Sequence, residues 1–188
     1  MENIAEIKTI NLDNILKLRS EWDTLLQKLI DDKLLPDHKH RPTYFSIQID
    51  SLTEYFKNLI IKIQFELGLD LSDVRIIYHD FYKYPATKNS TIIHKDGPRK
   101  STITVPIYAK DPVIFYHDDQ SKAERTKLFQ KPKLVYYYDY MNPVLLNVQN
   151  FHAWFTLDEK EPRVLLQLNL QERFENIVAR NINKLVVK

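Results

Sequence analysis

Short runs of β-branched and aromatic residues fill the second half of the sequence, and this pattern limits the possible folds most strongly. Pro, Asp and Asn separate the runs, which is typical of strands joined by turns. About eight short strands at this spacing predict a β-sandwich or jelly roll. The runs are residues 74–82, 91–94, 102–108, 113–116, 134–140, 144–148, 153–156 and 164–170.

Two amphipathic helices are expected before these strands. Between residues 15 and 30 apolar side chains recur at three- and four-residue steps, which forms one stripe along a helix. A second helix should begin near Ser51, where Ser51 and Glu54 form a capping box, and should end at Gly68. An isolated helix of this length is marginal in water, so each stripe needs an apolar partner. We therefore expect both helices to support the outer face of one sheet, away from any metal site.

Length and cysteine content favour one domain held together by its core. A chain of 188 residues can bury roughly 70% of its unfolded surface. We therefore expect a single domain over residues 1–188, with mainly helical support over 1–70 and a β core over 74–170. The absence of cysteine excludes disulfides, thiolate metal ligands and a cysteine nucleophile. A metal site would need His, Asp or Glu.

Charge and hydropathy restrict the partners. The chain has 27 Lys and Arg against 25 Asp and Glu, and the basic residues are scattered, so no clear nucleic-acid footprint stands out. The first residues lack the basic segment, apolar run and cleavage site of a secretory signal, and no run of about 18 apolar residues occurs. We expect a soluble, cytoplasmic protein without a membrane partner.

The first candidate site is the His-Lys-Asp sequence at residues 94–96. In an extended strand, His94 and Asp96 project to the same side about 7 Å apart, which is suitable spacing for metal ligands. Asp-Gly-Pro, which begins at Asp96, is also a standard turn sequence. On this segment alone a polar hairpin bend is the favoured interpretation, and the metal site stays open.

The second candidate site lies between residues 143 and 170 and contains His152 and Arg163. We predict an antiparallel hairpin in which Arg163 pairs near Thr156, roughly 13 Å from His152. An arginine side chain plus a five-carbon diacid spans that distance. Considered singly, His152 fits a core histidine and Arg163 a strand-edge cation. Strand alternation puts Arg163, Leu165 and Gln167 on one face and Val164, Leu166 and Leu168 on the other.

Considered together, these residues form an ordered set that resembles the Fe(II)- and 2-oxoglutarate-dependent dioxygenases over about residues 76–170. The set is His-x-Asp on an early strand, a histidine on a late strand and an arginine eleven residues later. The resemblance implies a double-stranded β-helix core (jelly roll, cupin-like). It implies that His94, Asp96 and His152 bind Fe(II) facially, which leaves positions for 2-oxoglutarate and dioxygen. It also implies that Arg163 pairs with the distal carboxylate of 2-oxoglutarate.

Within this family the prolyl-hydroxylase-like branch is the most similar. Members of that branch have a Tyr-Pro pair before the His-x-Asp sequence, and Tyr84 with Pro85 stands at the matching spacing. The resemblance implies that Tyr84 hydrogen-bonds the cosubstrate carboxylate. It also implies hydroxylation of an unactivated C–H bond with release of succinate and CO2, because Asp96 is present where halogenating members have a small residue. The substrate, peptidyl proline or a small molecule, is determined by loops that the sequence does not explain.

Two other function classes stay open. One is a catalytically silent jelly-roll module for binding or structure, and the other is a metal hydrolase without redox chemistry. The complete set of three ligands and an arginine argues against the silent module. Succinate formation would distinguish the oxygenase from the silent module, and turnover without oxygen would indicate the hydrolase.

The remaining histidines are expected to lie outside the site. His38 and His40 fall in a Pro-bounded polar connection and are predicted to be surface residues. His79 and His117, each followed by aspartate, are predicted to be solvated.

Three further segments have open interpretations. Arg99 and Lys100 follow the first candidate site, and they fit an anionic subsite or a solvated hairpin about equally. The tyrosines at 136–138 and 140 could line a substrate cleft, although core and edge packing is more common for strand tyrosines. The polar segment 118–133 is predicted to be a long loop or short helix that covers the site.

Overall fold

The computed structural model describes residues 2–12, 14–35, 43–79, 93–97, 99–117, 132–154 and 162–188. This part is mainly β with flanking helices, as predicted. The helices are α1 (Ile15–Asp31), η1 (Ile49–Ser51), α2 (Glu54–Leu67), α4 (Phe174–Arg180) and η2 (Ile182–Lys184), of which η1 and η2 are 3-10 helices. The strands are β1 (Ile4–Ile7), β2 (Thr43–Ser46), β3 (Leu71–His79), β4 (Ser101–Tyr108), β5 (Val113–Phe115), β6 (Leu134–Tyr136), β7 (Val144–Leu146), β8 (His152–Trp154), β9 (Arg163–Leu170) and β10 (Leu185–Val187).

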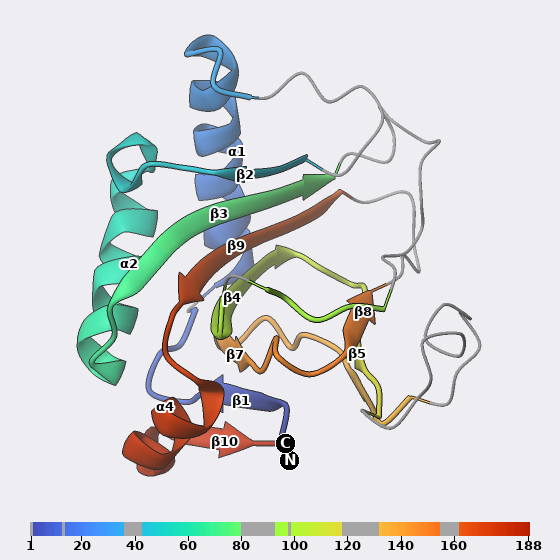
Figure 1. Cartoon of the computed structure of the whole chain (residues 1–188). Coiled ribbons are helices and arrows are strands. Elements are labelled where there is room, and N and C mark those ends of the chain that lie inside the picture. Colours follow the sequence, from blue (N-terminus) through green and yellow to red (C-terminus); the bar gives the residue numbers. More distant parts are fainter. Residues whose placement is uncertain are drawn as a thin grey trace.

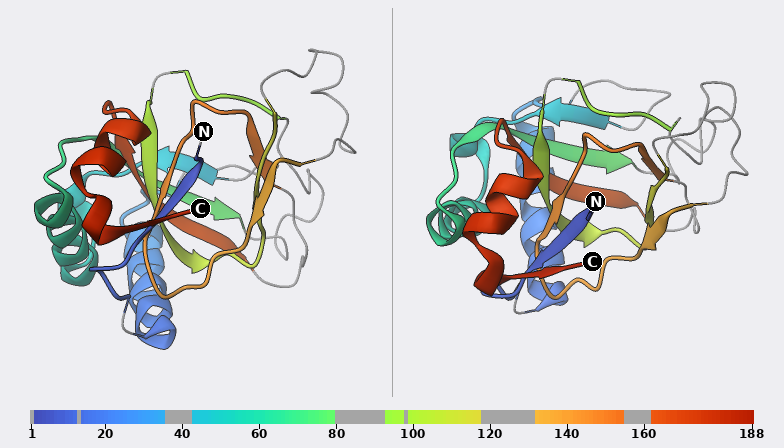
Figure 2. Two further views of the ribbon diagram at one scale, coloured as in Figure 1. Left: turned by 90° about the horizontal axis from the view of Figure 1, so that it is seen from below. Right: turned by 60° about the horizontal axis from the view of Figure 1, so that its bottom comes forward.

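The strands form two sheets that face each other. The larger sheet has the strand order β10-β1-β7-β4-β9-β3-β2, and the smaller sheet has the order β6-β5-β8. Helices α1 and α2 cover one face of the larger sheet, and the smaller sheet lies on the other side (Figure 1). The same arrangement is visible after rotation (Figure 2). Apolar side chains of both sheets pack in one cluster that includes Val113, Phe115, Val144 and Leu146.

Helix α1 packs its apolar stripe on the larger sheet. The side chain of Asn14 caps the helix by accepting a hydrogen bond from the Leu16 amide at 2.8 Å. The ring of Trp22 lies against that of Tyr78 on β3, with centroids 5.5 Å apart. The buried residues of α1 are Leu18, Trp22, Leu25 and Leu29. The expected packing of α1 on the outer face of a sheet is therefore confirmed.

Helix α2 covers the same face, although its start differs from the prediction. Its cap is Thr53, whereas Ser51 belongs to η1, so the capping box of Ser51 with Glu54 is wrong. Leu52 and Thr53 are extended, and this break separates the 3-10 turn from the helix. The helix ends where expected, because Gly68 has φ +62°, a conformation in which a residue without a side chain is least strained.

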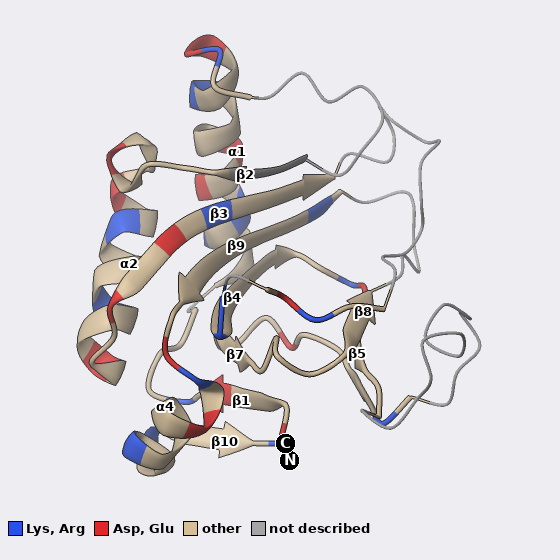
Figure 3. Cartoon of the chain, viewed as in Figure 1, with Lys and Arg blue, Asp and Glu red and all other residues tan. Residues whose placement is uncertain are grey.

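The outer surfaces of both helices carry mixed charge. Lys and Arg are interspersed with Asp and Glu along α1 and α2 (Figure 3). None of the helices in the described ranges combines the length and apolar content needed to cross a bilayer.

Strand β9 separates the helix-covered face of the larger sheet from its inner face. Val164, Leu166, Leu168 and Leu170 pack in the same core cluster as the helices. The alternate residues Arg163, Leu165, Gln167 and Asn169 line a cavity on the opposite face. This division confirms the predicted alternation. It also explains why polar residues can occupy a strand whose eight residues are all buried.

The two ends of the chain supply elements that the sequence did not predict. Strand β1 lies between β7 and β10, with Ala5 opposite both Leu145 and Val187. The N- and C-terminal strands therefore lie side by side, as Figure 1 shows. Strand β2 and helix α4 were also not predicted. Strands β1, β2 and β10 have only three or four residues each, which is too short for a periodic pattern in the sequence.

Candidate functional site

The segment that contains His94 and Asp96 runs beside β8. The backbones of His94 and His152 exchange two hydrogen bonds of 3.0 and 2.9 Å, which form an isolated antiparallel bridge. The Asp96 amide donates to the Val148 carbonyl at 3.0 Å. Backbone pairing therefore places the two halves of the candidate site next to each other, although they are far apart in the sequence.

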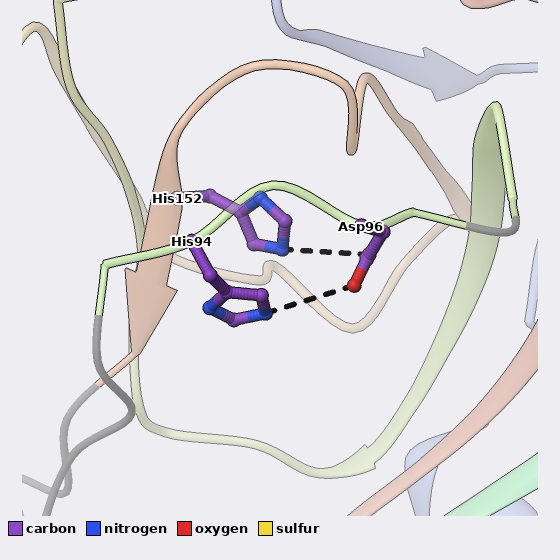
Figure 4. Close-up of side chains that lie close together, drawn as sticks. All are labelled: His94, Asp96 and His152. Carbon is purple, nitrogen blue, oxygen red and sulfur yellow. Dashed lines mark ion pairs between the residues drawn. The ribbon is translucent and has the colours of Figure 1, made fainter.

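The side chains of His94, Asp96 and His152 point toward one another (Figure 4). His94 Nε2 lies 3.6 Å from Asp96 Oδ1, and His152 Nε2 lies 3.6 Å from Asp96 Oδ2. One potential ligand atom of each residue lies within 4.8 Å of the other two. Ligands bound at about 2.1 Å to one ion are about 3.0 Å apart at right angles and about 4.2 Å apart when opposite. Both 3.6 Å separations lie between these two values, so small movements of the side chains would let one divalent ion contact all three.

The surroundings of His152 prepare it to act as a ligand. Its Nδ1 lies 2.9 Å from the Asn150 carbonyl oxygen. Because a carbonyl oxygen only accepts, Nδ1 carries the proton, and Nε2 has its lone pair directed toward Asp96. Burial, followed by the nearby His94, lowers the pKa of His152 to about 4. The ring is therefore neutral at physiological pH, which is the form that binds metals.

Arg99 is part of this cluster. Its Nε donates to Asp96 Oδ2 at 2.8 Å, and its Nη1 donates to the side chains of Gln167 at 2.8 Å and Asn169 at 2.7 Å. The Arg99 side chain is only 12% exposed. The solvated-hairpin interpretation is therefore wrong for Arg99. The Lys100 amide donates to the Leu170 carbonyl at 2.9 Å, which extends the pairing of β4 with β9 by one hydrogen bond.

A cavity of about 520 Å³ opens beside the three side chains and is lined by both sheets. The larger sheet supplies side chains of β3, β4, β7 and β9, and the smaller sheet supplies β5 and β8. His94, Asp96, His152, Arg99 and Arg163 all line it. Tyr138 also lines the cavity, whereas Tyr137 is exposed. The cleft interpretation therefore applies to only one of these two tyrosines.

Arg163 lies in the wall of the cavity and is 3% exposed. Its guanidinium stacks on the Trp154 ring at 4.3 Å, and its Nε lies 3.5 Å from Asp111 Oδ2. Within the described residues, Arg163 Nε and Nη1 have no hydrogen-bond partner. Burial lowers the pKa of Arg163, but an arginine stays charged in proteins. A buried cation with unused donors is suited to an anionic ligand.

The predicted hairpin between His152 and Arg163 is wrong. Strand β8, which carries His152, pairs with β5 in the smaller sheet. Strand β9, which begins with Arg163, pairs with β3 and β4 in the larger sheet. The two residues therefore face the cavity from opposite sheets. Thr156 lies outside the described residues.

The two remaining histidines of the described residues, His79 and His117, differ in solvent exposure. His79 is 2% exposed and stands opposite Arg163 in the β3–β9 register, so its predicted solvation is wrong. His117 is exposed, as expected. The positions outside the described residues are Tyr84, Pro85, His38, His40, Asp80 and residues 118–131, most of the predicted covering segment.

Several polar residues near the site were not identified from the sequence. Asp73 and Arg75 on β3 and Asn169 on β9 line the cavity. Strand alternation could have identified Asn169, since it continues the series of Arg163 and Gln167. Asp111 lies in the connection between β4 and β5, where no periodic signal exists.

Comparisons with solved structures show which proteins share this fold. No protein-family model and no curated protein matches the sequence. The non-heme alpha ketoglutarate dependent carbocyclase SnoK from nogalamycin biosynthesis gives a TM-score of 0.60 at 8% identity, over 89% of this chain and 79% of that chain. HygX from Streptomyces hygroscopicus, with nickel and 2-oxoglutarate bound, gives 0.56 at 10% identity, over 89% and 82%. A Pseudomonas putida prolyl-4-hydroxylase gives 0.51 at 9% identity, over 92% and 94%. The predicted resemblance is confirmed at the level of the fold.

Proposed function

We propose that this chain is an Fe(II)- and 2-oxoglutarate-dependent oxygenase that hydroxylates an unactivated C–H bond of a small-molecule or peptidyl substrate. We further propose that residues 1–188 form one domain, in which the two facing sheets are a double-stranded β-helix (jelly roll) core and the N-terminal helices are its support. Two structural neighbours support this class, since SnoK is alpha ketoglutarate dependent and HygX has nickel and 2-oxoglutarate bound.

One observation carries the proposal: a His-Asp-His cluster and a buried arginine with unused donors line the same cavity. His94, Asp96 and His152 would hold Fe(II), since imidazole and carboxylate without thiolate suit this ion. Arg163 would bind the distal carboxylate of 2-oxoglutarate through two parallel hydrogen bonds. When bound, Fe(II) supplies the chemistry by which dioxygen oxidises 2-oxoglutarate to succinate and CO2 and places one oxygen atom on the substrate.

The other side chains of the cavity orient the ligands and exclude water. The Trp154 ring covers the Arg163 guanidinium and shields it from bulk solvent. The guanidinium would therefore donate its hydrogen bonds to a carboxylate in a site with little water, where such bonds are stronger. Apolar residues such as Ile77, Val113 and Leu165 complete the wall. Tyr84 remains a proposed second partner of the cosubstrate carboxylate on the resemblance alone.

Succinate formation tests the proposal. The purified chain is incubated with 2-oxoglutarate, Fe(II) and dioxygen, together with prolyl peptides or small molecules as substrates. We expect succinate that requires both Fe(II) and oxygen, that is lost in His94→Ala and that is retained in His117→Ala, an exposed histidine outside the cavity.

Two results would contradict the oxygenase. Metal binding without any succinate would indicate the silent binding module. Substrate turnover that persists without oxygen would indicate a metal hydrolase. A crystal soaked with Fe(II) and a 2-oxoglutarate analogue would then show by its extra density which substrate group approaches the metal.

A further inference from the structure

A buried network of hydrogen bonds connects Asp96 to strand β9. Arg99 is its centre, because one edge of the guanidinium holds Asp96 Oδ2 and Nη1 holds both Gln167 Oε1 and Asn169 Oδ1. These three bonds are 2.7–2.8 Å long, in the range of charge-assisted hydrogen bonds. The Arg99 and Asp96 side chains are only 12% and 14% exposed, so solvent weakens this pair less than it would a surface pair.

The far end of the network is also fixed. Asn169 Oδ1 lies 3.2 Å from Thr102 Oγ1, whose single proton can be donated to it or to the Leu168 carbonyl at the same distance, and Asn169 Nδ2 donates to Asp73 Oδ2 at 3.4 Å. These partners determine the orientation of the amide, because its oxygen faces two donors and its nitrogen faces a carboxylate. Asn169 therefore presents an acceptor to Arg99, and Arg99 has little freedom to turn away from Asp96.

The backbone around Asp96 and Arg99 is held from the other side by Gln149. Its Nε2 donates to the Asp96 carbonyl at 2.7 Å and to the Arg99 carbonyl at 2.6 Å. The backbone carbonyls of both residues are thus held by the turn after β7, while the Arg99 side chain reaches β9. The carboxylate of Asp96 is therefore fixed through both its backbone and its Oδ2 atom.

We propose that Arg99 is a positioning residue that orients the Asp96 carboxylate for metal binding. The two oxygens lie equally close to a histidine, since Oδ1 is 3.6 Å from His94 Nε2 and Oδ2 is 3.6 Å from His152 Nε2. They differ in their hydrogen bonds, because Oδ2 accepts from Arg99 and Oδ1 accepts none from any described residue. Oδ1 is therefore the oxygen that Asp96 offers to the ion. A carboxylate held in this way binds through one oxygen, which leaves coordination positions for other ligands. This inference rests on the metal site of the proposed function.

Strand β9 carries both the residues that hold Arg99 and the proposed cosubstrate anchor, Arg163. Arg163, Gln167 and Asn169 lie on one face of this strand, and the strand rises about 3.3 Å per residue. The proposed cosubstrate anchor at Arg163 is thus about 13 Å along the strand from the first residue that holds Arg99. One rigid central strand therefore sets the separation between the Asp96 support and the cosubstrate anchor.

Binding of Co(II) to the full chain tests the role of Arg99 without any turnover. Affinity is measured by calorimetry, and the visible absorption of bound Co(II) reports its coordination. Partners that orient metal ligands typically contribute 10- to 100-fold in metal affinity. We expect Arg99→Gln to weaken Co(II) binding by roughly tenfold or more and to change the absorption spectrum. Arg99→Lys, which keeps the charge and one donor, should lose less affinity.

Two further variants separate positioning from simple stability. Arg19→Gln removes a half-buried arginine that donates to the Ile107 carbonyl and stacks on Tyr108, far from the cavity, so it should leave affinity and spectrum unchanged. Asn169→Ala keeps Arg99 but removes an acceptor of Nη1, so it should weaken binding by a smaller factor than Arg99→Gln. If Arg99→Gln does not fold, Asn169→Ala carries the test.

The outcomes are distinct. Weaker binding and an altered spectrum in Arg99→Gln, or in Asn169→Ala, with normal values in Arg19→Gln support the positioning role. If the unmodified chain binds Co(II) and these network variants bind it with the same affinity and spectrum, the positioning role is overturned and the metal site stands. If the unmodified chain binds no Co(II), the metal site of the proposed function fails, and this inference fails with it.

Discussion

The variant Arg163→Lys should weaken the binding of 2-oxoglutarate and leave the metal site intact. Arg163 is 3% exposed, lies against the Trp154 ring and has two nitrogen atoms without a hydrogen-bond partner in the described part of the chain. Lysine keeps the positive charge but loses the planar fork that matches a carboxylate. The substitution therefore removes one of two proposed hydrogen bonds without removing the charge.

The expected size follows from that lost bond. A hydrogen bond that involves a charged group contributes about 1.5–3 kcal/mol. Each 1.4 kcal/mol changes an equilibrium constant about tenfold, so the dissociation constant of 2-oxoglutarate should rise roughly 10- to 100-fold. Metal affinity should stay nearly unchanged, because Arg163 has no contact with His94, Asp96 or His152 among the described interactions.

Anaerobic calorimetry with Mn(II) in place of Fe(II) measures both constants without turnover. Arg180→Lys is the matched control, since Arg180 is 45% exposed and pairs with Glu172 outside the cavity. Thermal unfolding of each variant verifies that the fold is retained. An unchanged dissociation constant for 2-oxoglutarate in a folded Arg163→Lys variant would refute the anchor and the main reason for naming this cosubstrate.

Three further predictions concern the metal site and the helices. His94→Ala should lower Mn(II) affinity at least 100-fold by calorimetry, whereas His117→Ala should not, and equal losses would place the metal elsewhere. Trp22→Ala should lower the free energy of unfolding by about 3–5 kcal/mol in denaturant titrations, because it empties a buried site between α1 and β3, while the exposed Leu16→Ala should change it by less than about 0.5 kcal/mol. Gly68→Ala should lower it by about 1–2 kcal/mol, because φ is +62° there, and an unchanged midpoint would show that this conformation is not strained.

Local periodicity was enough to predict helix α1 and the two faces of strand β9. The apolar steps along residues 15–30 place one face of α1 on the sheet, because helix geometry is set by neighbouring residues. Alternation along β9 likewise assigned Arg163 and Gln167 to the inner face. The start of α2 was predicted wrongly, since the capping-box pattern at Ser51 also fits a 3-10 turn that ends before the helix.

The types of residue at the candidate site were also accessible from the sequence. His94 and Asp96 stand two residues apart, and the absence of cysteine limits a metal site to imidazole and carboxylate. Neither observation could choose between a turn and a metal site. That choice needed the position of His152, which is 56 residues after Asp96.

Only the tertiary structure decided how these residues meet. The sequence favoured a hairpin that joins His152 to Arg163, whereas β8 and β9 belong to different sheets and face each other across the cavity. For Arg99 the sequence left an anionic subsite and a solvated hairpin equally open, whereas in the structure Gln167 and Asn169 of β9 accept hydrogen bonds from it. Strand pairing depends on backbone hydrogen bonds between distant segments, and these bonds leave no periodic trace in either segment alone. Residue types and faces are therefore local properties, whereas the partners of each face follow from how the whole chain closes around its core.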